Sequence, residues 1–128
     1  MIKVLLADNE QILLDGLSAL LRETDDIELV ATARDGQEAI ALIELHTIDV
    51  AILDIRMTPM DGLEAAFYLR GKYPDLKILM LTLHKEPSMI KKVVEMGIEG
   101  YVLKERGRED LIEAMGRTEH QKSRLHYS

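Results

Sequence analysis

Five short apolar runs alternate with segments of helical period along almost the whole chain, and this alternation restricts the fold more than any other feature. Each run is rich in Val, Ile and Leu, as expected of strands covered on both faces of a parallel sheet. The predicted strands are Ile2 to Ala7, Ile27 to Ala33, Val50 to Leu53, Ile78 to Leu81 and Gly100 to Leu103. The pattern therefore indicates successive strand–helix units.

The segments between the runs carry apolar residues at the spacing of one helical face. These residues are Ile12, Leu13, Leu17, Leu20 and Leu21 in the first segment, Ala39, Ile40, Leu42 and Ile43 in the second, Leu63, Ala66, Phe67 and Leu69 in the third, and Met89, Ile90, Val93, Val94 and Met96 in the fourth. Pro87 is typical of a first helical turn, and Gly97 is predicted to cap the same helix at its C-terminus. A fifth helix is expected from Glu109 to about Arg117.

These units predict an α/β fold, a single doubly wound (βα)5 domain with a parallel five-stranded sheet. The 128 residues are enough to bury one hydrophobic core without disulfides or metals. We expect the domain to occupy residues 1–117. Residues 118–128 are polar and are predicted to be the end of a helix and a tail, or the start of a linker.

Composition argues against several classes of function. The chain has no cysteine, which excludes a disulfide scaffold, a thiolate zinc site and cysteine catalysis. A net charge of −7 disfavours direct binding to nucleic acid, which draws on clustered Lys and Arg. The apolar run at the N-terminus is too short for a signal peptide or a membrane span, so a cytoplasmic protein without membrane contact is expected.

Chemically useful side chains follow the predicted strands at one edge of the sheet. They are Asp8 and Asn9 after the first strand, Asp54 after the third, Thr82 after the fourth and Lys104 after the fifth. Functional groups in such sheets collect where the carboxyl ends of the strands meet. Any one of these residues alone would more often be a helix cap, a loop residue or a solvated charge, so the argument depends on the set.

The set suits the transfer of a phosphoryl group. Carboxylate and amide oxygens are the ligands that Mg²⁺ takes, usually one or two carboxylates completed by waters and a phosphate. In an in-line displacement the Asp54 carboxylate would attack phosphorus, while Lys104, the Thr82 hydroxyl and the cation hold the oxygens that carry the developing charge.

These strand-end residues, together with Met57-Thr58-Pro59-Met60-Asp61-Gly62, resemble the receiver domains of bacterial response regulators over nearly the whole chain. The resemblance implies a flavodoxin-like sheet of order 2-1-3-4-5 and a phosphorylation-dependent signalling switch. It implies that Asp54 is the phosphoacceptor and that Mg²⁺ or another divalent cation is held by Asp8, Asn9, Asp54 and the backbone carbonyl of Arg56. Thr82 and Lys104 would bind the phosphoryl group, and Tyr101 would be the aromatic residue that turns inward on activation.

The segment Gly100-Tyr101-Val102-Leu103-Lys104-Glu105 is similar to the NarL/LuxR-type regulators, which append a helix-turn-helix domain. The partners implied are a sensor histidine kinase, the protein's own or a neighbouring effector domain and, on phosphorylation, a second copy of the chain. We therefore expect the natural protein to continue past Ser128 into a DNA-binding domain. As a response regulator, the chain would catalyse only its own phosphotransfer and dephosphorylation.

The chain departs from the family pattern in several places. The second acid that usually follows the first strand is Asn9, which removes one formal charge from the cation site. Glu10 is a candidate to compensate for that charge, but it is expected to point elsewhere, at the start of the helix. Pro59 stands one place later than usual in the loop, and Leu83 is bulkier than the usual small residue, which would slow entry to the site. His84 lies where the family tunes access of the hydrolytic water.

Two other functions fit part of the pattern. An aspartate-nucleophile phosphohydrolase would use the same residue types, but it needs an acid two residues after the nucleophile, where this chain has Arg56. A receiver-like interaction module that no longer accepts phosphate is the second alternative, and Asn9 favours it. Intact mass after incubation with a phosphodonor distinguishes the switch from the module.

Overall fold

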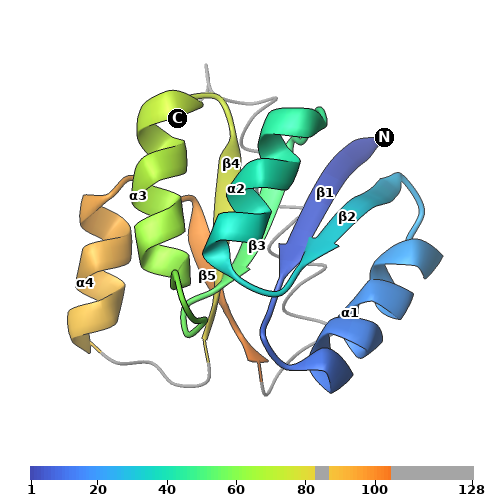
Figure 1. Ribbon diagram of the computed structural model, residues 1–128, viewed down its shortest axis with the longest axis horizontal. Coiled ribbons are helices and arrows are strands. Elements are labelled where there is room, and N and C mark those ends of the chain that lie inside the picture. Colours follow the sequence, from blue (N-terminus) through green and yellow to red (C-terminus); the bar gives the residue numbers. More distant parts are fainter. Residues whose placement is uncertain (83–86, 105–128) are drawn as a thin grey trace.

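The computed structural model describes residues 1–82 and 87–104, in which strands and helices alternate strictly (Figure 1). The strands are β1 (Ile2–Ala7), β2 (Ile27–Ala33), β3 (Val50–Asp54), β4 (Lys77–Thr82) and β5 (Gly100–Leu103). The helices are α1 (Gln11–Glu23), α2 (Gly36–Leu45), α3 (Gly62–Lys72) and α4 (Pro87–Glu95). Each predicted strand is present. β3 extends by one residue to include Asp54, and β4 extends by one residue at each end to include Lys77 and Thr82.

The strands form one sheet of order β2-β1-β3-β4-β5, and every neighbouring pair is parallel. This arrangement confirms the predicted α/β class and strand order. Because all strands run the same way, their carboxyl ends lie at one edge of the sheet.

Helices cover both faces of the sheet, which explains why the strands are apolar almost throughout. On one face α1 packs through Leu14, Leu17 and Leu21 against alternate residues of the strands. The other face is covered by α2, α3 and α4, whose buried residues share a core with the intervening strand positions. Figure 1 shows α1 set apart from the other three helices. All five residues of β3 are buried, as expected of the central strand.

Three residues predicted to face the core lie instead at the surface. Ile12 is 90% exposed, Phe67 74% and Val94 70%. In the same helices, nearby apolar residues are buried instead, such as Leu14 in α1 and Val93 in α4. Apolar spacing permits more than one helix rotation, and packing against the sheet selects one of them.

The helix ends follow the predicted signals. Pro87 is the first residue of α4, as predicted. Gly97 has a φ of +71°, its N–H donates to the Val94 carbonyl at 3.1 Å, and the Ile98 N–H donates to the Val93 carbonyl at 3.2 Å. This pair of bonds is a Schellman cap, which needs the left-handed backbone that glycine adopts without strain. Gly97 is therefore the C-terminal cap, as predicted.

Some predictions fall outside the described residues. They are the helix at 109–117, the boundary at residue 117, the tail 118–128, and the effects of Leu83 and His84. Among the residues that the structure describes, no helix has the length and apolar character needed to cross a membrane.

Candidate functional site

The strand-end residues singled out in the sequence lie together at the carboxyl edge of the sheet. Asp8 follows β1, Asp54 ends β3, Thr82 ends β4 and Lys104 follows β5. The register pairs Asp54 with Leu81, the residue before Thr82, and pairs Thr82 with Leu103, the residue before Lys104. Consecutive neighbours in the sheet thus carry these side chains to the same place.

Lys104 is the centre of this group. Its Nζ lies 3.1 Å from Asp8 Oδ2 and 3.0 Å from Asp54 Oδ2, and the lysine side chain is only 5% exposed. A third carboxylate oxygen, Glu10 Oε1, lies 3.4 Å from the same ammonium. One buried cation therefore contacts two buried acids and one exposed acid, and the group keeps an excess of negative charge.

The other oxygens of the two buried carboxylates are held by backbone amides two residues further along the chain. The Glu10 N–H donates to Asp8 Oδ1 at 2.8 Å, and the Arg56 N–H donates to Asp54 Oδ1 at 3.2 Å. These bonds orient both side chains. The Oδ2 atoms of Asp8 and Asp54 are buried and accept no hydrogen bond from the part of the chain described, so their contact with Lys104 is an ion pair without hydrogen-bond geometry.

Burial dominates the electrostatics of Asp54. Removal of its carboxylate from water, helped by the negative charge of Asp8, raises the pKa of Asp54 from 3.8 to about 6, and the opposing effects of Lys104 and of the Arg56 N–H are too small to cancel the rise. Burial alone would lower the pKa of Lys104, but the adjacent Asp54 carboxylate, followed by Asp8, outweighs burial, so that the pKa of Lys104 is raised. Lys104 therefore stays an ammonium at neutral pH.

Gly62 allows the loop after Asp54 to fold back on the strand end. A Cβ at this position would collide with the backbone carbonyl of Asp54, and the Gly62 N–H donates to the Ile55 carbonyl at 3.0 Å. Asp61 caps α3 by accepting from the Glu64 N–H at 2.8 Å, and Glu64 completes a capping box. The Asp-Gly pair of the sequence therefore starts α3 in contact with the candidate acceptor.

A cavity of about 240 Å³ opens at this edge. Its lining consists of Asn9, Glu10, Asp54, Ile55, Arg56, Thr82 and Lys104. The cavity brings together the acceptor, the hydroxyl and the ammonium that phosphoryl transfer needs. Asn9 also lines a second cavity, of about 330 Å³, together with the loop that follows Asp54.

The donor set fits a magnesium ion. Among the described residues no three His, Cys, Asp or Glu side chains are placed to hold a metal by themselves. Mg²⁺ does not need such a group, because it usually takes one or two carboxylates and keeps several waters. The buried Oδ2 atoms of Asp8 and Asp54 accept no hydrogen bond within the described residues and pair with the Lys104 ammonium, and they are oxygen donors of the required kind. The Asn9 amide and the Arg56 carbonyl belong to the same edge.

The sequence analysis gave the wrong direction for one residue of the site and missed another. Glu10 was expected to point away, but its carboxylate contacts Lys104 and lines the cavity, so that expectation was wrong. Arg34 follows β2, and its guanidinium donates to the Asn9 carbonyl at 2.8 Å and to Gln11 Oε1 at 2.7 Å. The missing charge at Asn9 identified Glu10 as a candidate compensating acid, but its place at the helix start predicted the wrong direction for its side chain. No local signal marks Arg34.

Tyr101 lies within β5, opposite Met80 of β4 in the register. It is partly buried and packs against the core that α2, α3 and α4 cover. This position lies three residues before Lys104, so movement of β5 would affect both side chains.

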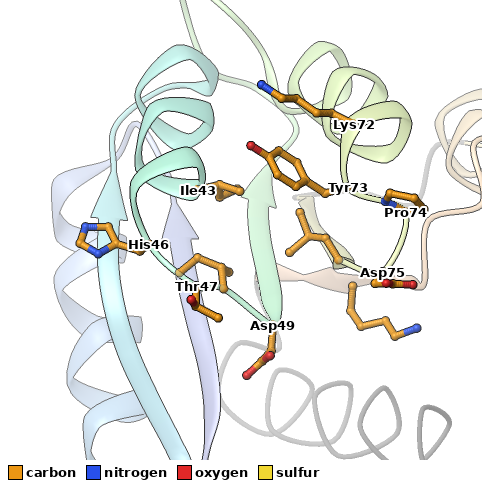
Figure 2. Close-up of a pocket in the computed structure, with 11 residues that line it drawn as sticks. Ile43, His46, Thr47, Asp49, Lys72, Tyr73, Pro74 and Asp75 are labelled. Atoms are coloured by element: carbon orange, nitrogen blue, oxygen red, sulfur yellow. The ribbon is translucent and has the colours of Figure 1, made fainter.

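A larger cavity, of about 690 Å³, lies at the opposite edge of the sheet. Figure 2 shows Asp49, Lys72 and Tyr73 on its rim, where α2 and α3 end and β3 and β4 begin. The Lys72 ammonium already contacts Glu44 at 3.5 Å and Tyr68 Oη at 3.3 Å. This cavity contains none of the residues that the strand-end chemistry predicts.

The chain is similar to known proteins over most of its length. The response regulator receiver domain family matches residues 4–116. The transcriptional regulatory protein DegU of Brevibacillus brevis is 36% identical over 114 residues, which cover 89% of this chain and 48% of DegU. The chain thus spans about half the length of the curated relatives it matches.

Solved structures give the same result. The signal receiver domain of the putative response regulator NarL from Mycobacterium tuberculosis superposes with a TM-score of 0.85 at 29% identity, covering 91% of this chain and 94% of that one. A LuxR-family DNA-binding response regulator from Staphylococcus aureus superposes with a TM-score of 0.86 at 32% identity, covering 91% and 98%.

Proposed function

The chain belongs to the response regulator receiver domain family, and on that premise we propose that it is a phosphorylation-dependent switch whose phosphoacceptor is Asp54. The observation that carries the proposal is the position of the Lys104 ammonium, 3.0 Å from Asp54 and 3.1 Å from Asp8 at the cavity that Thr82 also lines. A buried carboxylate beside a fixed cation and a hydroxyl is arranged for attack on phosphorus.

In the proposed reaction an Asp54 carboxylate oxygen attacks the phosphorus of a sensor kinase's phosphohistidine. The new O–P bond forms as the P–N bond breaks, and the electron pair of the P–N bond returns to the imidazole nitrogen. Lys104 stays an ammonium and stabilises a phosphoryl oxygen, while the Thr82 hydroxyl donates to another. Mg²⁺ would be held by Asp8, Asn9, Asp54 and the Arg56 carbonyl, and it would supply positive charge to the phosphoryl oxygens.

Phosphorylation would change the balance of charge around Lys104 and draw Thr82 toward the new group. We propose that Tyr101, in the strand next to Thr82, then turns inward and alters the face formed by α4 and β5. The readout would be a changed contact with an effector domain or with a second copy of the chain.

The proposed output is transcription in the cytoplasm through a DNA-binding domain that adjoins the receiver. DegU, which this chain resembles over about half of DegU's length, is named as a transcriptional regulatory protein. The chain's own charge of −7 argues that contacts to DNA would come from that further domain.

The proposal is tested by incubating the protein with acetyl phosphate and Mg²⁺ and measuring the intact mass. Asp54→Asn should block the gain of one phosphoryl group, whereas Asp75→Asn, an exposed acid at the far edge of the sheet, should leave it unchanged. A wild-type protein that gains no mass, with this donor or with a kinase, would instead support an interaction module that does not take phosphate.

A further inference from the structure

Glu10 stands at the start of a helix that its side chain does not cap. It is the N-cap residue of α1, yet its side chain makes no capping hydrogen bond. Ser, Thr, Asp and Asn are the side chains that cap well, because they are short enough to reach the first free N–H groups. The Glu10 carboxylate reaches instead to Lys104, which lies 94 positions along the chain, and it lines the cavity beside Asp54.

Lys104 and the three carboxylates in contact with it match the charge of a divalent cation only when Glu10 is included. Arg56 also lines the cavity, but its side chain is exposed and it is not counted in this group. Asp8, Asp54 and Glu10 carry three negative charges, and Lys104 carries one positive charge, which leaves −2. Without Glu10 the group would carry −1. Asn9, the other polar residue at the end of β1, contributes an amide and no charge.

We propose that Glu10 supplies the third negative charge of the cation site, in place of the carboxylate that Asn9 lacks. This inference rests on the proposed function, because the cation concerned is the one that phosphoryl transfer to Asp54 would use. Two buried carboxylate oxygens, Oδ2 of Asp8 and of Asp54, accept no hydrogen bond in the described part of the chain and supply donors for that cation.

Glu10 acts as a positioning residue rather than as a direct ligand. No three acidic or histidine side chains among the described residues are placed to share one metal. The Glu10 side chain is 59% exposed and contacts Lys104 at 3.4 Å, so it acts through charge and by holding the ammonium. An exposed charge is screened by salt, so the contribution of Glu10 must shrink as ionic strength rises.

The test measures Mn²⁺ affinity from the free Mn²⁺ signal in electron paramagnetic resonance, because Mn²⁺ takes the same oxygen ligands as Mg²⁺. Glu10→Gln should weaken binding about tenfold, the effect of one unit charge on a divalent cation several ångströms away in a water-like dielectric. Asn9→Asp should strengthen binding, and the double variant Asn9→Asp/Glu10→Gln should return to within about threefold of the wild type. Glu28→Gln, an exposed acid on β2, is the matched control and should change nothing.

A second measurement repeats the titrations at low and high salt, where the wild type and Glu10→Gln should converge. Equal affinities of the two proteins at low salt would overturn the inference, as would a wild type that binds no Mn²⁺. The intact-mass experiment with acetyl phosphate keeps the two ideas apart. If affinities change in the expected order while Asp54 gains no phosphoryl group, the role of Glu10 stands and the proposed function is wrong.

Discussion

Replacing Asp54 by asparagine is expected to stabilise the protein at neutral pH when no divalent cation is present. The pKa of Asp54 is raised from 3.8 to about 6 because its carboxylate is buried beside Asp8. Each pKa unit corresponds to about 1.4 kcal/mol, so ionised Asp54 destabilises the fold by about 3 kcal/mol above pH 7. Asparagine has the shape of the carboxyl group and no charge, and Lys104 keeps its ion pair with Asp8 at 3.1 Å.

The pH dependence follows from the same shift. Because the folded state binds the Asp54 proton more tightly than the unfolded state, the contribution of Asp54 to the free energy of unfolding falls as pH rises from about 4 to about 6. The variant lacks this titration. The two proteins should be about equally stable near pH 4, and the variant should be more stable at pH 7.5 by about 3 kcal/mol, or roughly 10 °C in Tm.

Urea unfolding in buffer with a chelator, at several pH values between 4 and 7.5, measures the difference between the two proteins. Subtracting one curve from the other removes the titration of the groups that do not interact with Asp54. Asp25→Asn, at an exposed acid, should follow the wild type throughout. A variant that is no more stable than the wild type at pH 7.5, or a difference that does not change with pH, would refute the assignment of a buried, destabilising charge to Asp54.

Three further substitutions test the surroundings of the acceptor and the packing behind it. Gly62→Ala should lower the free energy of unfolding by about 2 to 3 kcal/mol and reduce phosphorylation, because the new methyl group would meet the Asp54 carbonyl; unchanged urea midpoints would contradict this. Lys104→Met should lower the free energy of unfolding by about 3 to 5 kcal/mol, because it leaves buried carboxylates unpaired. An NMR titration of this variant should find the pKa of Asp54 above its value in the wild type, and an equal pKa would contradict the reasoning. Glu99→Ala should cost about 2 kcal/mol in chemical denaturation, because its carboxylate accepts from the Ile78 N–H at 2.7 Å and pairs with Arg70 at 2.6 Å; a midpoint within error of the wild type would show that other groups replace it.

The sequence analysis was most reliable for the strands and for the strand-end residues. Runs such as Val50 to Leu53 are apolar at every position because both faces of the sheet are covered, and this pattern is visible without any knowledge of distant contacts. Once the strands are parallel, their ends must meet at one edge. The proximity of Asp54 and Lys104 could therefore be predicted, although their roles in chemistry remain proposals.

Helix orientation was less predictable. Ile12 and Val94 satisfy the apolar spacing of their helices and yet lie at the surface. The helix faces that pack on the sheet are centred on Leu14 and Val93 instead. Local spacing contains no information about which of two similar faces finds a partner.

What the sequence determined by itself is the alternation of elements, their approximate ends and the kind of side chain that follows each strand. The tertiary structure decided which charges act together. Glu10 joins the site because the strand order places the end of β1 within reach of Lys104, 94 residues away. The pKa of Asp54 likewise depends on burial by distant elements. Periodicity reflects the local geometry of the backbone, whereas charge balance and desolvation depend on groups that only folding brings together.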